Sequence, residues 1–181
     1  KEQGLEMVED NMYFATPKTM EWIEKLKQES KKNGTVGCVV LDKQGNLTAG
    51  TSTGGMFKKR WGRIGDSPVI GAGTYADNNS CAVSCTGHGE YFIRHAVAFD
   101  VCARYKYLKE SVEKAADYII HTELNTNAGN GGLIAVDKLG NIAMPYNSGG
   151  MFRGFLYKEK GSPEIKKGCG IGKKIVVVGE K

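Results

Sequence analysis

Hydrophobic and polar positions change their period along the chain, and the changes predict where strands and helices lie. Residues 36–41 form an apolar run rich in β-branched side chains, which is typical of a strand inside a sheet. The stretch Asp42-Lys43-Gln44-Gly45-Asn46 has turn chemistry, and residues 47–53 return as a second strand. The pattern therefore predicts a β-hairpin over residues 36–53.

The design of this hairpin recurs further along the chain. Residues 41–46 and 52–57 align without a gap with residues 136–141 and 147–152. Two hairpins of one design suggest two sheets stacked face to face, each with a Gly-Gly turn at one rim.

Two segments between the hairpins have helical periodicity, 89–105 and 111–124, and Ser111 is placed to cap the second. The apolar stripe of the first helix consists of Phe92, His95, Ala96 and Phe99, and that of the second of Val112, Ala115, Ala116, Ile119 and Ile120. His95 is expected to be packed in the core. Strands, then helices, then strands predict an α+β fold with a layered sandwich.

Composition narrows the class of protein. The chain has 181 residues, 40% hydrophobic and 25% charged, as expected of one globular domain with a real core. No apolar run approaches the length of a membrane span. The net charge is +5, but the basic residues are not interleaved with aromatic residues over a long stretch, as they usually are on a nucleic-acid surface. Five cysteines, an odd number, argue against a disulfide framework. We therefore expect no membrane or nucleic-acid partner and a cytoplasmic location, with the periplasm as the alternative.

Residues 1–34 are not expected to form a domain of their own. Thr16-Pro17 supplies an N-cap and a first-turn proline for a short helix. From Lys25 to Lys32 the segment is Lys-rich and polar, which predicts an exposed linker.

Gly34 and Thr35 stand where this linker meets the first strand. Cleavage after Gly34 would free the α-amine of Thr35, whose pKa near ~8 would let it take the proton of the hydroxyl on its own residue. A self-processing N-terminal nucleophile hydrolase requires this arrangement. The alternative is an ordinary strand that begins after a glycine C-cap.

Two further stretches carry groups suited to binding a substrate. On the loop 62–68, Arg63 and Asp66 could clamp the α-carboxylate and α-ammonium of an amino acid, or form only a loop salt bridge. The stretch 85–90, just before a helix, offers backbone N–H groups and the Thr86 hydroxyl to a developing negative charge. A tight glycine turn is the alternative there.

Three other motifs do not support a site. Gly71-Ala72-Gly73 fits a dinucleotide fingerprint, but turn residues follow where a helix should run. Cys81, Cys85 and His88 lack a second ligand pair for a metal, so buried free thiols are expected. The three histidines have no serine or cysteine with an orienting acid to complete a triad.

Taken together, the motifs resemble the β-subunit of the plant-type L-asparaginase/isoaspartyl peptidase family, which are N-terminal nucleophile hydrolases with an αββα sandwich. The resemblance covers residues 35–157, and residues 1–34 are similar to the tail of the α-subunit. The motifs that carry it, in family order and spacing, are Thr35-Val36-Gly37, residues 51–56, residues 62–68, Gly71-Ala72-Gly73 and residues 86–90.

The resemblance implies a role for each catalytic group. Thr35 would be the nucleophile, exposed by autocleavage of the Gly34–Thr35 bond, and Thr53 would hydrogen-bond its hydroxyl and amine. The Thr86 hydroxyl and the Gly87 amide would form the oxyanion hole. The reaction would be acyl transfer from a β-aspartyl amide, an isoaspartyl dipeptide or L-asparagine, to Thr35, followed by hydrolysis.

The resemblance also implies how the substrate is held and what completes the protein. Arg63 and Asp66 would bind the α-carboxylate and α-ammonium, and Gly89, with Thr86 and Gly87, would line the pocket. No metal enters the chemistry, and the structural sodium of the family belongs to the α-subunit. Residues 35–181 would be the catalytic β-subunit, partnered by its own α-subunit in a dimer of αβ units.

The chain departs from the family in one respect, because most of the α-subunit is absent. We therefore expect residues 1–181 alone to be inactive. A glycosylasparaginase of the same fold and a non-catalytic pseudo-enzyme are the alternatives, although the former typically reads Thr-Ile-Gly where this chain has Thr35-Val36-Gly37. For the last residues, 168–181, we expect no more than an edge strand at 175–178.

Overall fold

The computed structural model describes residues 16–17, 20–21, 34–55, 62–158, 165–170 and 176–179. The chain divides into two compact units, residues 1–33 with 56–58 and residues 34–55 with 59–181. In the first unit the Met20 amide donates to the Thr16 carbonyl at 2.9 Å, as in the first turn of the predicted helix. The linker predicted at Lys25–Lys32 lies outside the described residues. The described strands, and the helices from residue 89 onward, all belong to the second unit.

The predicted hairpin is confirmed. Strand β1 (Gly34–Leu41) pairs antiparallel with β2 (Leu47–Gly55). In the turn, Asp42 Oδ1 accepts hydrogen bonds from the amides of Gln44 at 2.8 Å and Asn46 at 2.7 Å. Gly45 has φ +87°, a conformation that favours glycine. The turn sequence therefore fixes the hairpin locally.

The repeated turn is confirmed, but the repeated second strand is not. Asp137 Oδ1 accepts from the amides of Leu139 and Asn141 at 2.8 and 2.9 Å, as Asp42 does in the first hairpin. The turn joins β5 (Gly131–Asp137) to β6 (Ile142–Ala143), which is only two residues long. Pro145 soon follows and has no N–H to continue the ladder. Residues 147–152 therefore form no strand.

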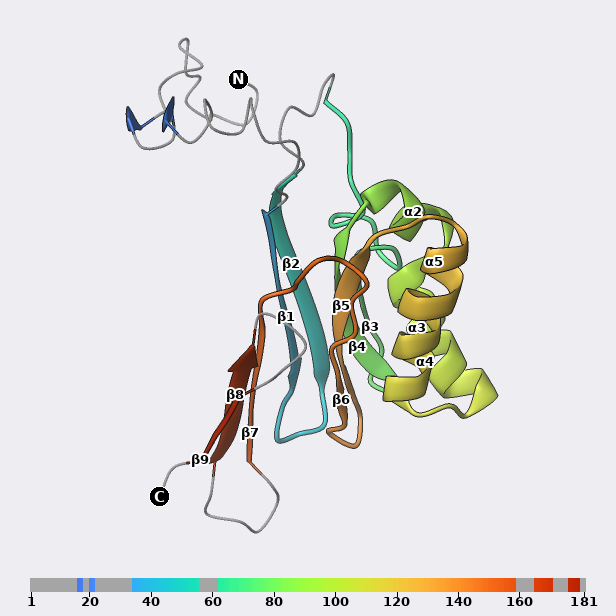
Figure 1. Cartoon of the computed structure of the whole chain (residues 1–181). Helices are drawn as coiled ribbons and strands as arrows, with labels where there is room; N and C mark the ends of the chain where they lie inside the picture. The colour runs from blue at the N-terminus through green and yellow to red at the C-terminus, as the bar shows by residue number, and fades with distance from the viewer. Residues whose placement is uncertain are drawn as a thin grey trace, which may run out of the picture. The chain divides into compact units, whose positions relative to one another are not determined.

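Strands β5 and β6 belong to a four-stranded antiparallel sheet of order β3-β4-β5-β6, with β3 at Thr74–Ala76 and β4 at Cys81–Gly87. The β1–β2 hairpin packs against one face of this sheet (Figure 1). Apolar side chains fill the contact, formed by Leu47, Ala82 and Val136 with Val39, Leu41, Ala49 and Ile142. The second helical layer of the expected αββα sandwich is not found among the described residues, so that expectation stays a prediction.

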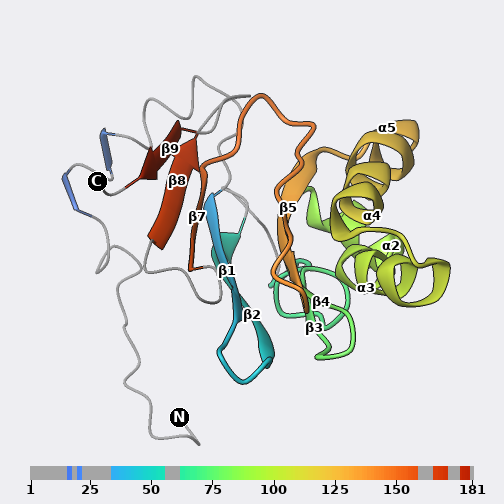
Figure 2. The same cartoon turned by 90° about the horizontal axis from the view of Figure 1, so that it is seen from below.

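The helices cover the other face of the four-stranded sheet (Figures 1 and 2). Alternate side chains of β4, those of Cys81, Val83 and Cys85, pack against them in the larger core. The helical segments are α2 (Gly89–Arg94), α3 (Val97–Ala103), a π-helical turn (Arg104–Leu108), α4 (Val112–Tyr118), a second π-helical turn (Ile119–Glu123) and α5 (Leu124–Thr126).

The helix predicted at 111–124 is confirmed as α4 with its π-helical and α5 continuation. Ser111 caps it, because its Oγ accepts a hydrogen bond from the Lys114 amide at 3.3 Å. All five predicted stripe residues are fully buried. Helical periodicity and a capping residue agree here, and the local prediction holds.

The helix predicted at 89–105 is wrong in part, because it breaks at Ala96, whose φ is +45°. The first free amides of α3 do not donate hydrogen bonds to carbonyls of the preceding helix. The Ala98 amide donates to the Ala72 carbonyl at 3.1 Å and the Phe99 amide to the Gly71 carbonyl at 2.8 Å. A turn distant in sequence thus caps α3. Phe99, predicted to lie on the buried stripe, is 44% exposed.

His95 is also not the core residue that the stripe predicted. It lies at the break, half-buried, with Nδ1 3.2 Å from the Glu123 carboxylate.

Near the end of the chain, β7 (Arg153–Lys158), β8 (Ile165–Gly170) and β9 (Val176–Gly179) form a three-stranded antiparallel sheet in that order. The C-terminal strand is therefore an edge strand, as predicted. None of the helices in the described residues is long and apolar enough to cross a bilayer.

The contact between the sheets gives a first testable prediction, at Gly37. A Cβ added to Gly37 would lie 2.1 Å from Ser84 Oγ and 2.9 Å from Ser84 Cβ. We expect Gly37→Ala to lower the free energy of unfolding by about 2 kcal/mol, because the strands must separate to admit the methyl group. Gly50→Ala is the matched control on the same hairpin, since nothing lies within 4 Å of its added Cβ. Equal urea midpoints for the two variants would contradict the close approach of β1 to β4.

Candidate active site

Thr35 and Thr53 face each other across the hairpin, where they are direct partners in the β1–β2 register. The Thr35 hydroxyl donates to Thr53 Oγ1 at 3.1 Å. The Thr53 hydroxyl donates in turn to the Gly34 carbonyl oxygen at 2.9 Å, and the Gly55 amide donates to Thr53 Oγ1 at 2.9 Å. The hydroxyl of Thr53 therefore connects Thr35 to the carbonyl of the peptide bond that precedes it.

The backbone is irregular at this peptide bond. The pairing register of β1 and β2 shifts between Gly34 and Thr35, as at a β-bulge. Bulges re-aim side chains and often lie next to functional sites. Gly34 has no other atom within 4 Å of where a Cβ would stand, so its lack of a side chain is not a packing requirement among the described residues.

The packing of the hairpin on the four-stranded sheet brings Thr35 and Thr53 to the same end as Thr86. At the turn end of the hairpin, the Leu47 amide donates to Asn78 Oδ1 at 2.7 Å, just before β4 begins. Two pleats further along β2, Thr51 Oγ1 lies 2.6 Å from Ser84 Oγ. Because every second side chain of a strand lies on the same face, Thr53 and Thr86 each lie one step beyond this contact, on the same faces as Thr51 and Ser84.

Thr86 and Gly87 end β4, and α2 begins two residues later at Gly89. Gly87 has φ +148°, and a Cβ there would lie 2.3 Å from the Asn130 carbonyl oxygen. The turn after β4 therefore requires glycine. It is held to β5 because the His88 amide donates to the same Asn130 carbonyl at 2.9 Å.

The Asp66 carboxylate is buried against two glycines. A Cβ added to Gly73 would lie 2.8 Å from Asp66 Oδ2, and one added to Gly89 would lie 2.7 Å from Asp66 Oδ1. Oδ2 has no hydrogen-bond partner among the described residues. Burial raises the pKa of the Asp66 carboxyl, and the nearby Glu90 carboxylate raises it further, whereas Arg63 lowers it. The lack of a side chain at Gly89 thus leaves room for this carboxylate, and the predicted place of Gly89 in the site stays a prediction.

Arg63 also contacts the first turn of α2, where its Nε lies 3.6 Å from Glu90 Oε1. Its side chain is 29% exposed, so the guanidinium is accessible from solvent. Glu90 is not singled out by the sequence patterns, although it stands directly after Gly89. Together, these contacts place the Arg63–Asp66 loop beside the Thr86–Gly89 turn.

Sequence reasoning also missed three hydroxyls beneath these residues, those of Thr51, Thr74 and Ser84. Thr51 precedes Thr53 by two positions and Ser84 precedes Thr86 by two, so each shares a strand face with a predicted site residue. That alternation was the available signal.

The residues excluded as sites have structural roles. Gly71-Ala72-Gly73 is the turn that caps α3 and receives Asp66, rather than a phosphate loop. His88 lies beside the Tyr91 ring, with 6.2 Å between centroids, and His121 is 3.5 Å from Asp117. Within the described ranges, no group of three His, Cys, Asp or Glu side chains is placed to hold a metal ion.

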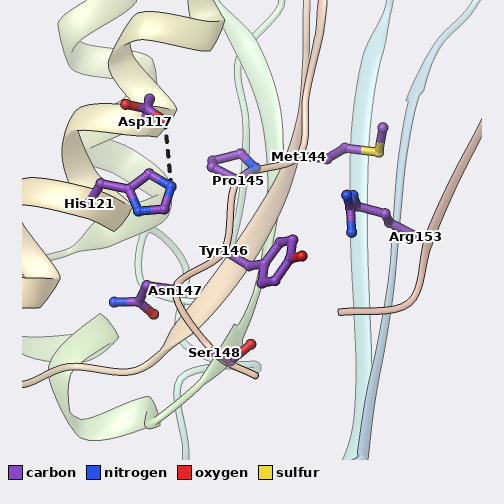
Figure 3. Close-up of a pocket in the computed structure, with 8 residues that line it drawn as sticks. All are labelled: Asp117, His121, Met144, Pro145, Tyr146, Asn147, Ser148 and Arg153. Atoms are coloured by element: carbon purple, nitrogen blue, oxygen red, sulfur yellow. Dashed lines mark ion pairs between the residues drawn. The ribbon is translucent and has the colours of Figure 1, made fainter. Parts of the chain in front are cut away.

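A surface pocket lies elsewhere, between α4 with the turn that follows it and the segment that joins β6 to β7 (Figure 3). None of the predicted site residues lines it. Its lining consists of Asp117, His121, Met144, Pro145, Tyr146, Asn147, Ser148 and Arg153.

A family model described as asparaginase matches residues 2–165. An isoaspartyl peptidase of Salmonella typhimurium is 54% identical over 129 residues, which are 71% of this chain and 41% of that protein. The isoaspartyl peptidase of Escherichia coli is 49% identical over 143 residues, 74% of this chain and 44% of that protein. A probable isoaspartyl peptidase/L-asparaginase of Arabidopsis thaliana is 53% identical over 120 residues, 66% of this chain and 36% of that protein.

The chain thus spans less than half the length of these curated relatives. The resemblance inferred from the motifs is confirmed by both the family match and the relatives. The chain belongs to the asparaginase family, which has the N-terminal nucleophile hydrolase fold.

Proposed function

We propose that this chain carries the nucleophile of a self-cleaving threonine hydrolase that acts on β-aspartyl amides, namely isoaspartyl dipeptides and L-asparagine. The hydrogen-bond chain from the Thr35 hydroxyl through Thr53 to the Gly34 carbonyl oxygen carries the proposal. It connects a nucleophile, a proton relay and the carbonyl of one peptide bond. The names of the relatives supply the class of substrate.

The first step is cleavage of the Gly34–Thr35 bond. Thr35 Oγ attacks the carbonyl carbon of Gly34 while its proton passes to Thr53, and the Thr53 proton moves to the Gly34 oxygen as negative charge develops there. As the bond to the Thr35 nitrogen breaks, the nitrogen takes the proton from the Gly34 oxygen, and the carbonyl re-forms as an ester on Thr35 that water then hydrolyses. The products are a carboxylate at Gly34 and a free α-amine at Thr35.

The second step uses the freed amine as a base. With a pKa near ~8 it takes the proton of the Thr35 hydroxyl, which attacks the β-carbonyl of the substrate. The Thr86 hydroxyl and the Gly87 amide stabilise the oxyanion. The amine then protonates the leaving ammonia or amino acid, and water releases aspartate from the ester on Thr35.

The charged pair holds the substrate. Arg63 binds the α-carboxylate in place of Glu90, and Asp66 binds the α-ammonium through the oxygen that lacks a partner among the described residues. A β-aspartyl group presents both charges on one carbon and its reactive carbonyl one methylene away. This geometry favours β-linked over α-linked aspartyl substrates.

We further propose that an α-subunit completes the site and that residues 1–181 alone are inactive.

The proposed activity is tested by an assay of the full-length protein on a β-aspartyl dipeptide, L-asparagine and a glycosylated asparagine, with release of free aspartate as the readout. Turnover of the first two supports the proposal. Preferential cleavage of the glycosylated substrate would indicate a glycosylasparaginase instead. A correctly folded protein without turnover of any of the three would indicate a pseudo-enzyme.

A further inference from the structure

Three hydroxyl side chains meet between the two sheets, where a sandwich core is ordinarily apolar. They come from three strands, Thr51 on β2, Thr74 on β3 and Ser84 on β4, and we call them the hydroxyl cluster. Thr51 Oγ1 lies 2.6 Å from Ser84 Oγ, and the Thr74 hydroxyl donates to Thr51 Oγ1. Ser84 is only 3% exposed.

The hydroxyl cluster is bonded to the loop that carries the proposed substrate clamp. The Thr74 hydroxyl lies 3.1 Å from the Ser67 carbonyl oxygen, and that of Thr51 lies 3.3 Å from the Gly73 carbonyl oxygen. The Gly73 amide donates to the Asp66 carbonyl at 3.1 Å. A continuous set of hydrogen bonds therefore runs from Thr51 on β2 through Gly73 to Asp66, and the Thr74 hydroxyl lies within hydrogen-bond distance of Ser67 as an alternative acceptor.

The hydroxyl cluster also lies one pleat from the proposed catalytic hydroxyls. Thr51 is two residues before Thr53 on β2, and Ser84 is two residues before Thr86 on β4. The sheets approach so closely here that Gly37 has no room for a Cβ. Buried hydroxyls are unfavourable unless they are paired, and no atom of the hydroxyl cluster is among the unpaired buried atoms of the described residues.

We propose that Thr51, Thr74 and Ser84 are positioning residues that set the nucleophile strands against the Arg63–Asp66 loop and the Thr86 turn. The inference rests on the proposed function. Apolar side chains would hold the sheets together but allow them to slide, whereas directional hydrogen bonds define one arrangement. Catalysis by acyl transfer requires this, because a misplacement of about 1 Å can reduce the rate roughly 100-fold.

The test compares Thr51→Val, which keeps the shape and removes the hydroxyl, with Thr51→Ser, which keeps the hydroxyl. Thr48→Val is the matched control on the exposed face of the same strand. In the full-length protein, well below its unfolding temperature, we expect Thr51→Val to lower kcat/KM for a β-aspartyl dipeptide about 10- to 100-fold. Thr51→Ser should restore most of it, and Thr48→Val should leave it unchanged.

Amide hydrogen exchange separates this inference from the proposed function. Thr51→Val should raise exchange about tenfold at the Gly73 amide and its neighbours in residues 66–74, and leave the amides of α4 unchanged. This result is expected even if the protein turns over no β-aspartyl substrate, in which case only the proposed function fails. Unchanged exchange in residues 66–74, or an equal rise throughout the protein, would overturn the positioning role.

A second, independent observation concerns two buried thiols. Cys81 begins β4 and Cys102 lies in α3, and their Sγ atoms are 2.7 Å apart. Both side chains are almost completely buried. Their hydrogen bond lowers the pKa of the Cys102 thiol. A disulfide has an S–S length of about 2.05 Å, so only a small movement separates the pair from a covalent bond.

We infer that Cys81 and Cys102 form a disulfide during folding, before the core closes over them, when a disulfide such as oxidised glutathione is present as the oxidant. The two thiols lose two protons and two electrons and form one S–S bond, and glutathione leaves as two thiols. The closed loop, residues 81–102, contains the whole Thr86–Gly89 turn. The disulfide would therefore restrain the motion of the segment that carries the proposed oxyanion hole.

The test uses the full-length protein with the two exposed cysteines replaced, Cys38→Ser and Cys169→Ser. It is refolded in glutathione buffers of increasing oxidised fraction and mapped by mass spectrometry. We expect a Cys81–Cys102 cross-linked peptide and an unfolding constant about 100-fold smaller than that of the reduced protein. Cys102→Ala should lose both effects. Free thiols or glutathione adducts alone at the most oxidising buffer would overturn the inference.

Discussion

Replacing Thr35 with alanine is expected to leave the Gly34–Thr35 bond intact and to abolish hydrolysis of β-aspartyl substrates. The variant removes the hydroxyl that donates to Thr53, and with it the only attacking oxygen in the proposed first step. Removal of a nucleophile that acts with its base as a unit lowers kcat by about 10⁴-fold or more. An intact-mass measurement of the full-length protein should show one uncleaved chain, where the unaltered protein shows two.

Two variants sharpen this expectation. Thr35→Ser keeps the hydroxyl and should still be cleaved, whereas Thr53→Val keeps the shape but breaks the chain to the Gly34 carbonyl and should be cleaved far more slowly. A fragment that begins at residue 35 in the alanine variant would contradict self-cleavage by Thr35. Normal cleavage of Thr53→Val would remove the proton relay while leaving the nucleophile in place.

The elements that could be predicted from the sequence are those with local causes. The turn at residues 42–46 is fixed by the Asp42 side chain and by Gly45, which adopts a positive φ, and both residue types are visible in the sequence. The helix that begins after Ser111 combines a capping hydroxyl with an apolar stripe that is fully buried. Neither depends on a distant part of the chain, so pattern and structure agree.

The break at Ala96 has a distant cause and could not be predicted in this way. Its stripe suggested one continuous helix, but the carbonyls of Gly71 and Ala72 take the first amides of α3. Partners that precede them by 26 and 28 residues decide where α3 begins. The residues around this turn exclude a nucleotide loop, but no local pattern indicates that its carbonyls cap a helix.

In the candidate site, too, local structure places some residues and distant segments of the chain place others. Thr35 and Thr53 meet because the turn at residues 42–46 fixes which residues of the hairpin are opposite each other. The placement of Asp66 depends on Gly73 and Gly89, which come from two other segments. For Arg63 and Asp66, charge alone suggested a clamp, and the family resemblance assigned it. The Glu90 partner emerges only when the loop packs against α2, and strand alternation was the only sequence signal for the hydroxyl cluster.

Replacing Asp66 with asparagine is expected to change activity and stability in opposite directions. The variant removes the carboxylate that binds the α-ammonium, and loss of one partner from a buried charge pair lowers kcat/KM by about 100-fold or more. Most of the loss should appear as a higher KM. Stability should rise at neutral pH, because the variant also removes a buried charge whose Oδ2 has no partner among the described residues.

The dependence of this stability gain on pH arises from the raised pKa of Asp66, which has burial as its main cause. A carboxyl with a higher pKa in the folded than in the unfolded protein binds protons more tightly when folded, so its contribution to stability decreases as pH rises through that interval. The unaltered protein therefore carries the unfavourable charge at neutral pH and loses it on acidification. Urea unfolding of both proteins should show a gap in midpoints at pH 7 that narrows as the pH falls toward the ordinary range of an aspartate. A gap that widens on acidification would mean that Asp66 is stabilised as a carboxylate, and the vacant partner position could not be the ammonium site.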